Sequence, residues 1–530
     1  MENYLETVKK ARIGAIIPII KIVEGPINPT ELFAKISNYG RKKNSLLFES
    51  ADTATKYGEI SILAASPCLR VMGYKENFEI TALSSIGRQF LKFIKNDFGF
   101  CDSVKYTQEQ ITGKLVPKRK AVDEAQRLRL KNHSDIIRQI AFKFKPLSYS
   151  RIPYSGLFGA IGHSFIDQHE ELPQKEPEMP SYELYFLDNL ALISHKDNKA
   201  YIIANAMVMD SKREEAYRQC ISVIKSYEKA MQSKLPKLKK PKMKKQLIET
   251  DLQKENYEII ANKIKSSIMH GKIFQAHLSR TIISSYNAEP LEIYAELKKI
   301  APSPYMFFIN SKNSALIGSS YQMFLNIRGD KEKVIEARLM SGAKPRGIIN
   351  NAIDEEFDSK YEAELRLDKK LLSQHTTLID AARNDIAMIS KPGTRKLRSA
   401  FAIEKLPYCH QIASDIEGVL KNDIDVLHAC LVFMNPVSLS GIPKIEALKI
   451  LRENEASARG FYGGIVCCIT SSGDFESAVI PSSILLANGK AHIKTGATIS
   501  YDSVSKSRFD ESEENARACM EALNKAGGLK

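Results

Sequence analysis

Long hydrophobic runs are missing from this sequence of 530 residues. No stretch of about 18 consecutive apolar residues occurs, and because a membrane-spanning helix needs that length, we expect no membrane span. The longest apolar stretch near the start, residues 13–20, is short, contains Pro18 and lacks a small-residue cleavage site. It therefore does not predict a signal peptide.

Cysteines at metal-binding spacing are missing as well. The eight cysteines are scattered, and the adjacent pair Cys467 and Cys468 suits neither a C-x-x-C site nor an ordinary disulfide. We expect most of them to act as small buried hydrophobic residues in a reducing compartment. The sequence therefore favours a cytoplasmic protein.

The composition is that of a folded protein, with 43% hydrophobic and 26% charged residues, which excludes wholesale disorder. A chain of 530 residues is too long for one simple core and predicts two domains or one large composite fold. The predicted strands and helices do not alternate regularly. This irregular order favours an α+β class over a doubly wound α/β sheet.

The formal net charge of +15 is concentrated in part in one short stretch. Seven lysines lie there, at Lys234, Lys237, Lys239, Lys240, Lys242, Lys244 and Lys245. Basic residues without interleaved aromatics are typical of a solvated linker, so we do not expect nucleic-acid binding. The stretch predicts a boundary at residues 232–247, between an N-terminal part (1–231) and a C-terminal part (248–530).

Periodicity predicts the main elements of the second half. Apolar residues at helical spacing indicate helices over 256–271, 371–388, 444–454 and 510–525. Apolar runs indicate strands over 463–470, 477–486 and 491–499, and a further strand over 45–50 in the first half.

Several glycine-rich turns follow in the second half. They include Gly342-Ala343-Lys344-Pro345-Arg346-Gly347, Ser440-Gly441-Ile442-Pro443, Gly460-Phe461-Tyr462-Gly463-Gly464 and Gly496-Ala497-Thr498. Glycine lets backbone N–H groups approach a ligand, so such loops suit a carboxylate or a phosphate. None of them has the spacing of a dinucleotide-binding or P-loop motif.

Taken together, the order and spacing of these motifs resemble the chorismate-utilising enzymes, and most closely the large subunit of anthranilate synthase. The resemblance covers most of the chain. It is carried by the segments 46–52, Ile273-Phe274-Gln275, Leu278-Ser279-Arg280, 303–308, 344–347, Ala382-Arg383-Asn384-Asp385, Leu439-Ser440-Gly441 and Tyr462-Gly463-Gly464.

The resemblance implies a fold with two β-sheets packed face to face and helices outside. It also implies the conversion of chorismate and ammonia to anthranilate and pyruvate, with Mg²⁺ and with ammonia from a partner glutamine amidotransferase. The N-terminal part would be regulatory and the C-terminal part would bind chorismate. Catalytic positions implied by the resemblance are Gly342, Ala343, Gln411, Tyr462, Ser482, Gly496, Ala497 and Thr498, and the magnesium positions are Gln374 and Glu511.

Several of these positions depart from the family pattern. Gln374 stands where the family has a magnesium-binding Glu, and a neutral amide should lower Mg²⁺ affinity steeply. Ser482 replaces a carboxylate-binding Arg, and Gln411 replaces the catalytic His. Leu371 and Arg508 also stand at acidic positions, Ala343 replaces a Thr, and Thr498 replaces a Gly.

The family's inhibitor site looks better preserved. In anthranilate synthases tryptophan binds near the strand and the turn that correspond here to Glu49, Ser50, Pro304, Tyr305 and Met306. Two hypotheses therefore stay open. The chain is either an anthranilate synthase component I-like enzyme of tryptophan biosynthesis, or a catalytically silent homologue that binds tryptophan or an amidotransferase partner. His410, next to Gln411, could compensate for the missing His.

Overall fold

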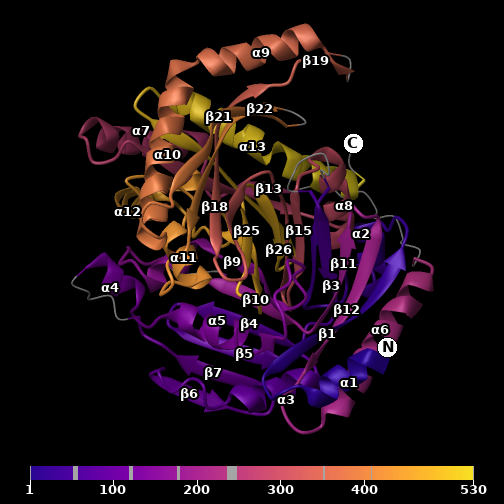
Figure 1. Ribbon diagram of the computed structural model, residues 1–530. Helices are drawn as coiled ribbons and strands as arrows, with labels where there is room; N and C mark the ends of the chain where they lie inside the picture. The colour runs from indigo at the N-terminus through magenta and orange to yellow at the C-terminus, as the bar shows by residue number, and fades with distance from the viewer. Residues whose placement is uncertain are drawn as a thin grey trace.

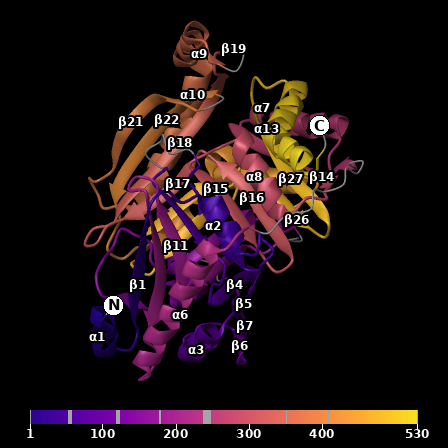
Figure 2. The ribbon, with the colours of Figure 1, turned by 90° about the vertical axis from the view of Figure 1, so that its right-hand side faces the viewer.

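The computed structural model describes residues 2–51, 58–117, 123–175, 179–235, 247–349, 352–406 and 409–528. Two large β-sheets pack face to face, and helices cover their outer faces (Figures 1 and 2). The α+β class is confirmed. Most of the predicted boundary, residues 236–246, lies outside the described residues.

The first sheet contains 13 strands. Across the sheet these are β13 (Ile248–Thr250), β14 (Gln275–Ser285), β27 (Lys490–Ser500), β26 (Ser483–Ala487), β16 (Ser314–Ser320), β15 (Tyr305–Asn310), β2 (Ser45–Glu49), β3 (Ile60–Ala64), β11 (Asn189–Ser194), β12 (Lys199–Met207), β1 (Ala15–Glu24) and β8 (Lys145–Pro146), with β23 (Gly441–Ile442) beside β14.

The second sheet contains 12 strands. In order they are β21 (Lys396–Lys405), β22 (Cys409–Val419), β18 (Val334–Pro345), β17 (Met323–Arg328), β25 (Phe475–Val479), β24 (Ile465–Thr470), β9 (Gly156–Ile161), β10 (Tyr182–Leu187), β4 (Leu69–Tyr74), β5 (Asn77–Ala82), β7 (Gln110–Lys114) and β6 (Ser103–Tyr106). A separate two-stranded ribbon joins β19 (Ile348–Ile349) and β20 (Ala352–Ile353).

Both sheets combine strands from the two sides of the lysine-rich stretch. In the first sheet β15 pairs with β2, and in the second sheet β24 pairs with β9. The predicted parts 1–231 and 248–530 therefore do not correspond to separate sheets, and the roles assigned to the two parts stay a prediction.

Helices bury apolar faces on the outside of each sheet. The first sheet is covered by α1 (Glu2–Lys10), α2 (Pro29–Ile36), α6 (Arg213–Gln232), α8 (Pro290–Ile300) and α13 (Ser505–Ala526). The second is covered by α3 (Ser85–Ile94), α5 (His133–Ala141), α10 (Lys369–Ile389) and α11 (Val426–Phe433). The remaining helices are α4 (Glu124–Leu128), α7 (Lys254–Met269), α9 (Glu355–Leu367), α12 (Lys444–Asn454) and the 3-10 turns η1 (His163–Gln168) and η2 (Val437–Leu439).

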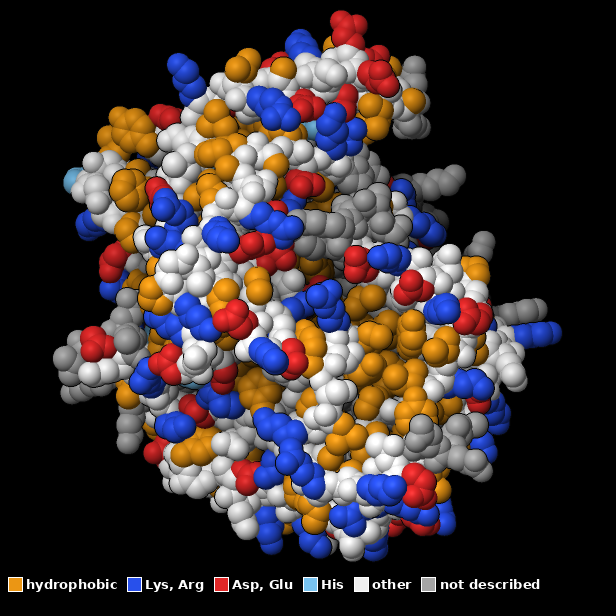
Figure 3. Space-filling model, viewed as in Figure 1, with side chains coloured by type: hydrophobic (Ala, Val, Ile, Leu, Met, Phe, Trp, Pro, Cys, Tyr) orange, Lys and Arg blue, Asp and Glu red, His pale blue; other side chains and the backbone are white. Residues whose placement is uncertain are grey.

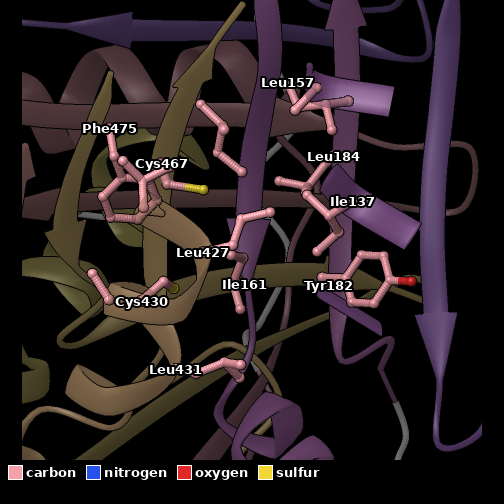
Figure 4. Packing of buried hydrophobic residues seen from close by; sticks show 14 of the residues in the cluster. Ile137, Leu157, Ile161, Tyr182, Leu184, Leu427, Cys430, Leu431, Cys467 and Phe475 are labelled. Atoms are coloured by element: carbon pink, nitrogen blue, oxygen red, sulfur yellow. The ribbon is translucent and has the colours of Figure 1, made fainter. Parts of the chain in front are cut away.

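The outer core of the second sheet is seen at close range in Figure 4. Ile137 of α5 lies beside Leu184 of β10, whereas Leu427 of α11 lies near Cys467 of β24. Cys467 is a buried free thiol, as the sequence predicts for a small hydrophobic residue.

Alternate residues of a strand belong to different hydrophobic clusters, one between the sheets and one under the outer helices. In β2, Leu46 and Phe48 join the cluster between the sheets, whereas Leu47 joins the cluster under the outer helices. Successive side chains of a strand point to opposite faces, so this sheet is buried on both sides.

Most predicted elements of the second half form as expected. The helix predicted over 444–454 is α12, and that over 371–388 is α10, which begins after the N-cap Asp368. One strand prediction is wrong. Residues 477–486 do not form one strand but end β25 in one sheet and begin β26 in the other, because Pro481 has no N–H with which to continue a ladder.

Lys and Arg side chains are interspersed with Asp and Glu on the face shown in Figure 3. Among the described helices, none combines the length and the hydropathy needed to cross a membrane.

Candidate functional site

One group of the predicted site residues meets at a buried imidazole, His277 of β14. Its Nε2 lies 2.7 Å from the Tyr462 hydroxyl, and its Nδ1 lies 3.0 Å from Oγ1 of Thr498, the residue opposite it on β27. A Cβ atom on Gly496 would come within 2.7 Å of the same Nε2. Tyr462, Gly496 and Thr498 are therefore assembled around one side chain.

The His277–Tyr462 pair is uncharged at neutral pH. Burial lowers the pKa of His277 to about 3, and burial also raises the pKa of Tyr462. A neutral imidazole donates one hydrogen bond and accepts the other, so it links the tyrosine and threonine hydroxyls in one chain. His277 was not predicted as a site residue, and the sequence does not single it out, because its strand also contains polar residues such as Ser279, Arg280 and Thr281.

Ser482 and Ala497 belong to the same end of the first sheet. Ser482 lies at the break between β25 and β26, and its hydroxyl donates to Oγ1 of Thr495 at 3.4 Å. Ala497 is buried opposite Leu278. Ser482 brings no positive charge to this position, so a carboxylate ligand would find no guanidinium from it.

A second group of predicted residues lies between β18, β22 and α10. Gly342 has a φ of 61° at an irregularity in the β18–β22 pairing, a conformation that favours glycine. Ala343 is the cross-strand neighbour of Gln411. A Cβ atom on Gly342 would lie 3.3 Å from Cβ of Leu371, so an apolar side chain of α10 covers this glycine.

His410 does not take the place of the missing histidine. It is the next residue to Gln411 along β22, so its side chain points to the opposite face. It is fully buried, and its Nε2 lies 2.9 Å from Oδ1 of Asp358 in α9. The same carboxylate accepts hydrogen bonds from Arg346 and from the Gly347 N–H, so His410 belongs to a buried structural network.

The two predicted magnesium positions lie on α10 and α13, which both views place in the upper half of the molecule (Figures 1 and 2). The start of α10 is linked to the loop before α13 by an ion pair between Lys370 and Asp502 at 3.6 Å. Gln374 is half-buried on α10. Glu511 forms an ion pair with Arg508 one turn earlier on α13, and burial raises the pKa of Glu511 against the attraction of that arginine.

These residues do not fit a magnesium ion. Mg²⁺ requires hard, anionic oxygen ligands, whereas one position offers a neutral amide and the other a carboxylate already paired with a guanidinium. Within the described ranges, no cluster of three or more His, Cys, Asp or Glu side chains could hold a metal ion.

The five positions predicted for tryptophan all line one cavity between the two sheets. Glu49, Ser50, Pro304, Tyr305 and Met306 form one side of it, and residues 466–468 and 476–478 of β24 and β25 form the other. β2 and β15 are adjacent strands, with Glu49 opposite Met306, which explains why residues far apart in sequence meet here.

Ser50 holds this cavity wall together. Its hydroxyl lies 2.9 Å from the Ile60 carbonyl and 3.0 Å from the Pro304 carbonyl, and its N–H donates to Ser61 Oγ at 3.1 Å. It is buried, so a larger side chain here would enter the cavity or separate the strands.

The Glu49 carboxylate is bound on the outer side of the sheet. It accepts hydrogen bonds from Thr30 of α2 (2.9 Å) and from Tyr294 of α8 (2.6 Å), and it pairs with Lys298 of α8 at 2.6 Å. The side chain thus anchors two helices.

Comparison with known proteins agrees with this architecture. The family described as chorismate binding enzyme matches residues 97–521. Component 1 of anthranilate synthase from Escherichia coli is 30% identical over 501 residues, and that from Buchnera aphidicola subsp. Pemphigus spyrothecae is 30% identical over 506 residues. Each alignment covers 94% of this chain and 94% of the relative.

Solved structures show the same fold. Anthranilate synthase component I of Streptococcus pneumoniae superposes with a TM-score of 0.69 at 20% identity, over 87% of this chain and 92% of that one. The menaquinone-specific isochorismate synthase of Escherichia coli superposes with a TM-score of 0.65 at 12% identity, over 98% of this chain and 99% of that one. The chain belongs to the chorismate-binding enzyme family, among the relatives of anthranilate synthase component I.

Proposed function

We propose that this chain is a ligand-binding member of the family that lacks its magnesium-dependent turnover, and that the cavity between the sheets binds tryptophan. The Arg508–Glu511 ion pair carries the proposal, because it neutralises the one acidic side chain retained at the two metal positions. Gln374, Gln411 and Ser482 support it, since none of them supplies the charge or the imidazole that the family uses.

The cavity supports the second half of the proposal. Its walls combine apolar and aromatic side chains such as Phe48 and Tyr305 with the carbonyl-bound hydroxyl of Ser50, a surface suited to an indole ring. In this proposal the N-terminal part, residues 1–231, is the regulatory part, and residues 248–530 form the chorismate-binding part.

A second candidate function is the reaction of the relatives: chorismate and ammonia to anthranilate and pyruvate, with ammonia from a glutamine amidotransferase subunit. The observation in its favour is that Gly342, Tyr462, Gly496 and Ala497 keep the residue types that the family pattern requires.

One assay separates the two. Purified protein with chorismate, MgCl₂ and ammonium sulfate is followed by anthranilate fluorescence and by mass analysis of products. We expect little or no anthranilate; turnover comparable to that of an active relative measured in parallel would favour the second candidate. Titration calorimetry with L-tryptophan tests the cavity, with Ser50→Phe as the blocking variant, and an absence of binding heat would refute the tryptophan assignment.

A further inference from the structure

Two neighbouring cavities share one loop, residues 457–460, which follows α12 and leads to β24. The larger, of about 200 Å³, is lined by Thr281, Tyr462 and Lys494 among others. The smaller is lined by His163, Lys175 and Arg452, and residues 457–460 belong to the walls of both. No residue that lines the cavity between the sheets lines either of them.

Lys494 brings a buried ammonium group to this loop. The residue is 8% exposed, and its Nζ lies 2.7 Å from Ser457 Oγ, 3.0 Å from the Ala458 carbonyl and 3.2 Å from Thr281 Oγ1. Burial lowers the pKa of Lys494 to about 8, so the group still carries its charge at neutral pH. A fourth contact, to the Ser457 carbonyl, is 3.4 Å long, and all four partners are neutral oxygen atoms.

Other charged side chains that the structure describes around the two cavities pair with one another rather than with this lysine. Arg459 is paired with Glu455 at 2.6 Å, and Arg452 with Asp167 at 2.7 Å. Among the described residues, four cations and three anions line the cavities or bond to their lining: Lys175, Arg452, Arg459 and Lys494 against Asp167, Asp251 and Glu455. These described side chains alone have one positive charge more than negative charges, and a buried surplus charge is stabilised by a counterion.

Donor groups that could bind an anion are available in the same place. His163 is 5% exposed and lines the smaller cavity, and its Nε2 has no hydrogen-bond partner among the described residues. Within the same ranges, the backbone N–H groups of Ala458, Arg459 and Gly460 donate to no other backbone group. Consecutive backbone N–H groups next to a glycine with positive φ, such as Gly460, are a common anion-binding arrangement.

The larger cavity also has an apolar side. Met179, Leu316, Phe461 and Leu485 line it together with the polar residues. A ligand that fits both sides has one negatively charged group and an apolar body. We propose that loop 457–460 and Lys494 form a second ligand site, which binds the carboxylate of a small organic monoanion with an apolar body.

Titration calorimetry of the full-length protein at pH 7 tests this site with benzoate as the probe. We expect a Kd below about 1 mM, the range of a small ligand held by one charge and one apolar contact. Benzamide, the neutral isostere, and acetate, which lacks the ring, should each bind at least tenfold more weakly. Benzoate that binds no better than benzamide, or inorganic phosphate that binds in its place, would overturn the proposal.

Two variants locate the bound probe. Lys494→Met removes the charge, and Leu485→Trp fills the apolar side from a half-buried position outside the ion-pair network. Each variant should weaken benzoate binding at least tenfold. If Lys494→Met does not fold, the benzoate affinity of Leu485→Trp alone tests the location of the site. Lys490→Met, at an exposed lysine on the same strand, is the matched control and should bind as the wild type does. Ser50→Phe should also leave benzoate binding unchanged, and a loss of binding there would place the probe between the sheets and refute the assignment.

Discussion

Arg508 and Glu511 form an ion pair within one turn of α13, at the position where the family resemblance places a magnesium ligand. Glu511 is the one carboxylate at the two positions that the resemblance assigns to magnesium, and the ion pair engages it. Its consequence is testable without any measurement of turnover, because metal affinity can be measured directly.

Restoring the missing charges should restore magnesium binding. In the double variant Gln374→Glu with Arg508→Asp, two carboxylates replace an amide and a guanidinium, so we expect Mg²⁺ affinity to rise at least tenfold over the wild type by titration calorimetry. The control is Arg517→Asp, which changes the same charge further along α13, where Arg517 pairs with Glu514. Equal affinities in the double variant and the control would show that α10 and α13 do not face a common metal position.

Glu49 should affect stability more than tryptophan binding. Glu49→Gln removes the negative charge opposite Lys298 while keeping a hydrogen-bonding side chain, so the free energy of unfolding should fall by about 1–3 kcal/mol in urea titrations. Tryptophan affinity should change less than threefold, because the carboxylate is bound on the outer side. The control is Glu296→Gln on α8, the helix that also carries Lys298. A large loss of affinity without loss of stability would mean that the carboxylate contacts the ligand.

His277 should make the fold sensitive to acid. Its pKa is about 3 in the folded chain and about 6.5 when unfolded, so below pH 6.5 the unfolded state binds a proton that the folded state does not. Its contribution to stability is therefore complete above pH 6.5 and is lost as pH falls toward 3.

The variant His277→Gln keeps hydrogen bonding but does not titrate. Between pH 6 and pH 4 its free energy of unfolding should fall less steeply than that of the wild type, by about 1.4 kcal/mol per pH unit. Denaturant titrations at several pH values measure both slopes. Parallel slopes would show that His277 is already protonated in the folded protein.

Gly496→Ala should disturb the imidazole and its tyrosine together. The new methyl group would lie 2.4 Å from the Leu278 carbonyl and 2.7 Å from His277 Nε2, so the strands must separate or the ring must move. We expect a loss of about 1–3 kcal/mol in thermal or denaturant unfolding. Gly99→Ala is the matched control, because that glycine is exposed, has no neighbour within 4 Å of the added Cβ, and should tolerate alanine. A Gly496→Ala variant with the unfolding free energy of the wild type would contradict the close packing of β14 on β27.

Local pattern predicted the helices well. Pro443 and the apolar spacing after it place α12 at residues 444–454, and the apolar stripe of α10 is continuous. Prediction failed at residues 477–486, where a run of strand-forming residues hid a change of sheet at Pro481. Motif resemblance indicates candidate site positions, but it does not indicate that His277 lies within bonding distance of Tyr462 and Thr498 and next to Gly496.

The sequence by itself determined the family and the α+β class, because both follow from residue types in order along the chain. It also predicts that residues 374, 411 and 482 lack the charged or imidazole side chains of the family. Tertiary structure decided which groups are in contact. Glu511 is paired with Arg508, His410 is held by Asp358 beneath α9, and Lys494 is buried at a loop with surplus positive charge. Such pairings depend on strands and helices that are distant in sequence, and only the packing of both sheets brings them within bonding distance.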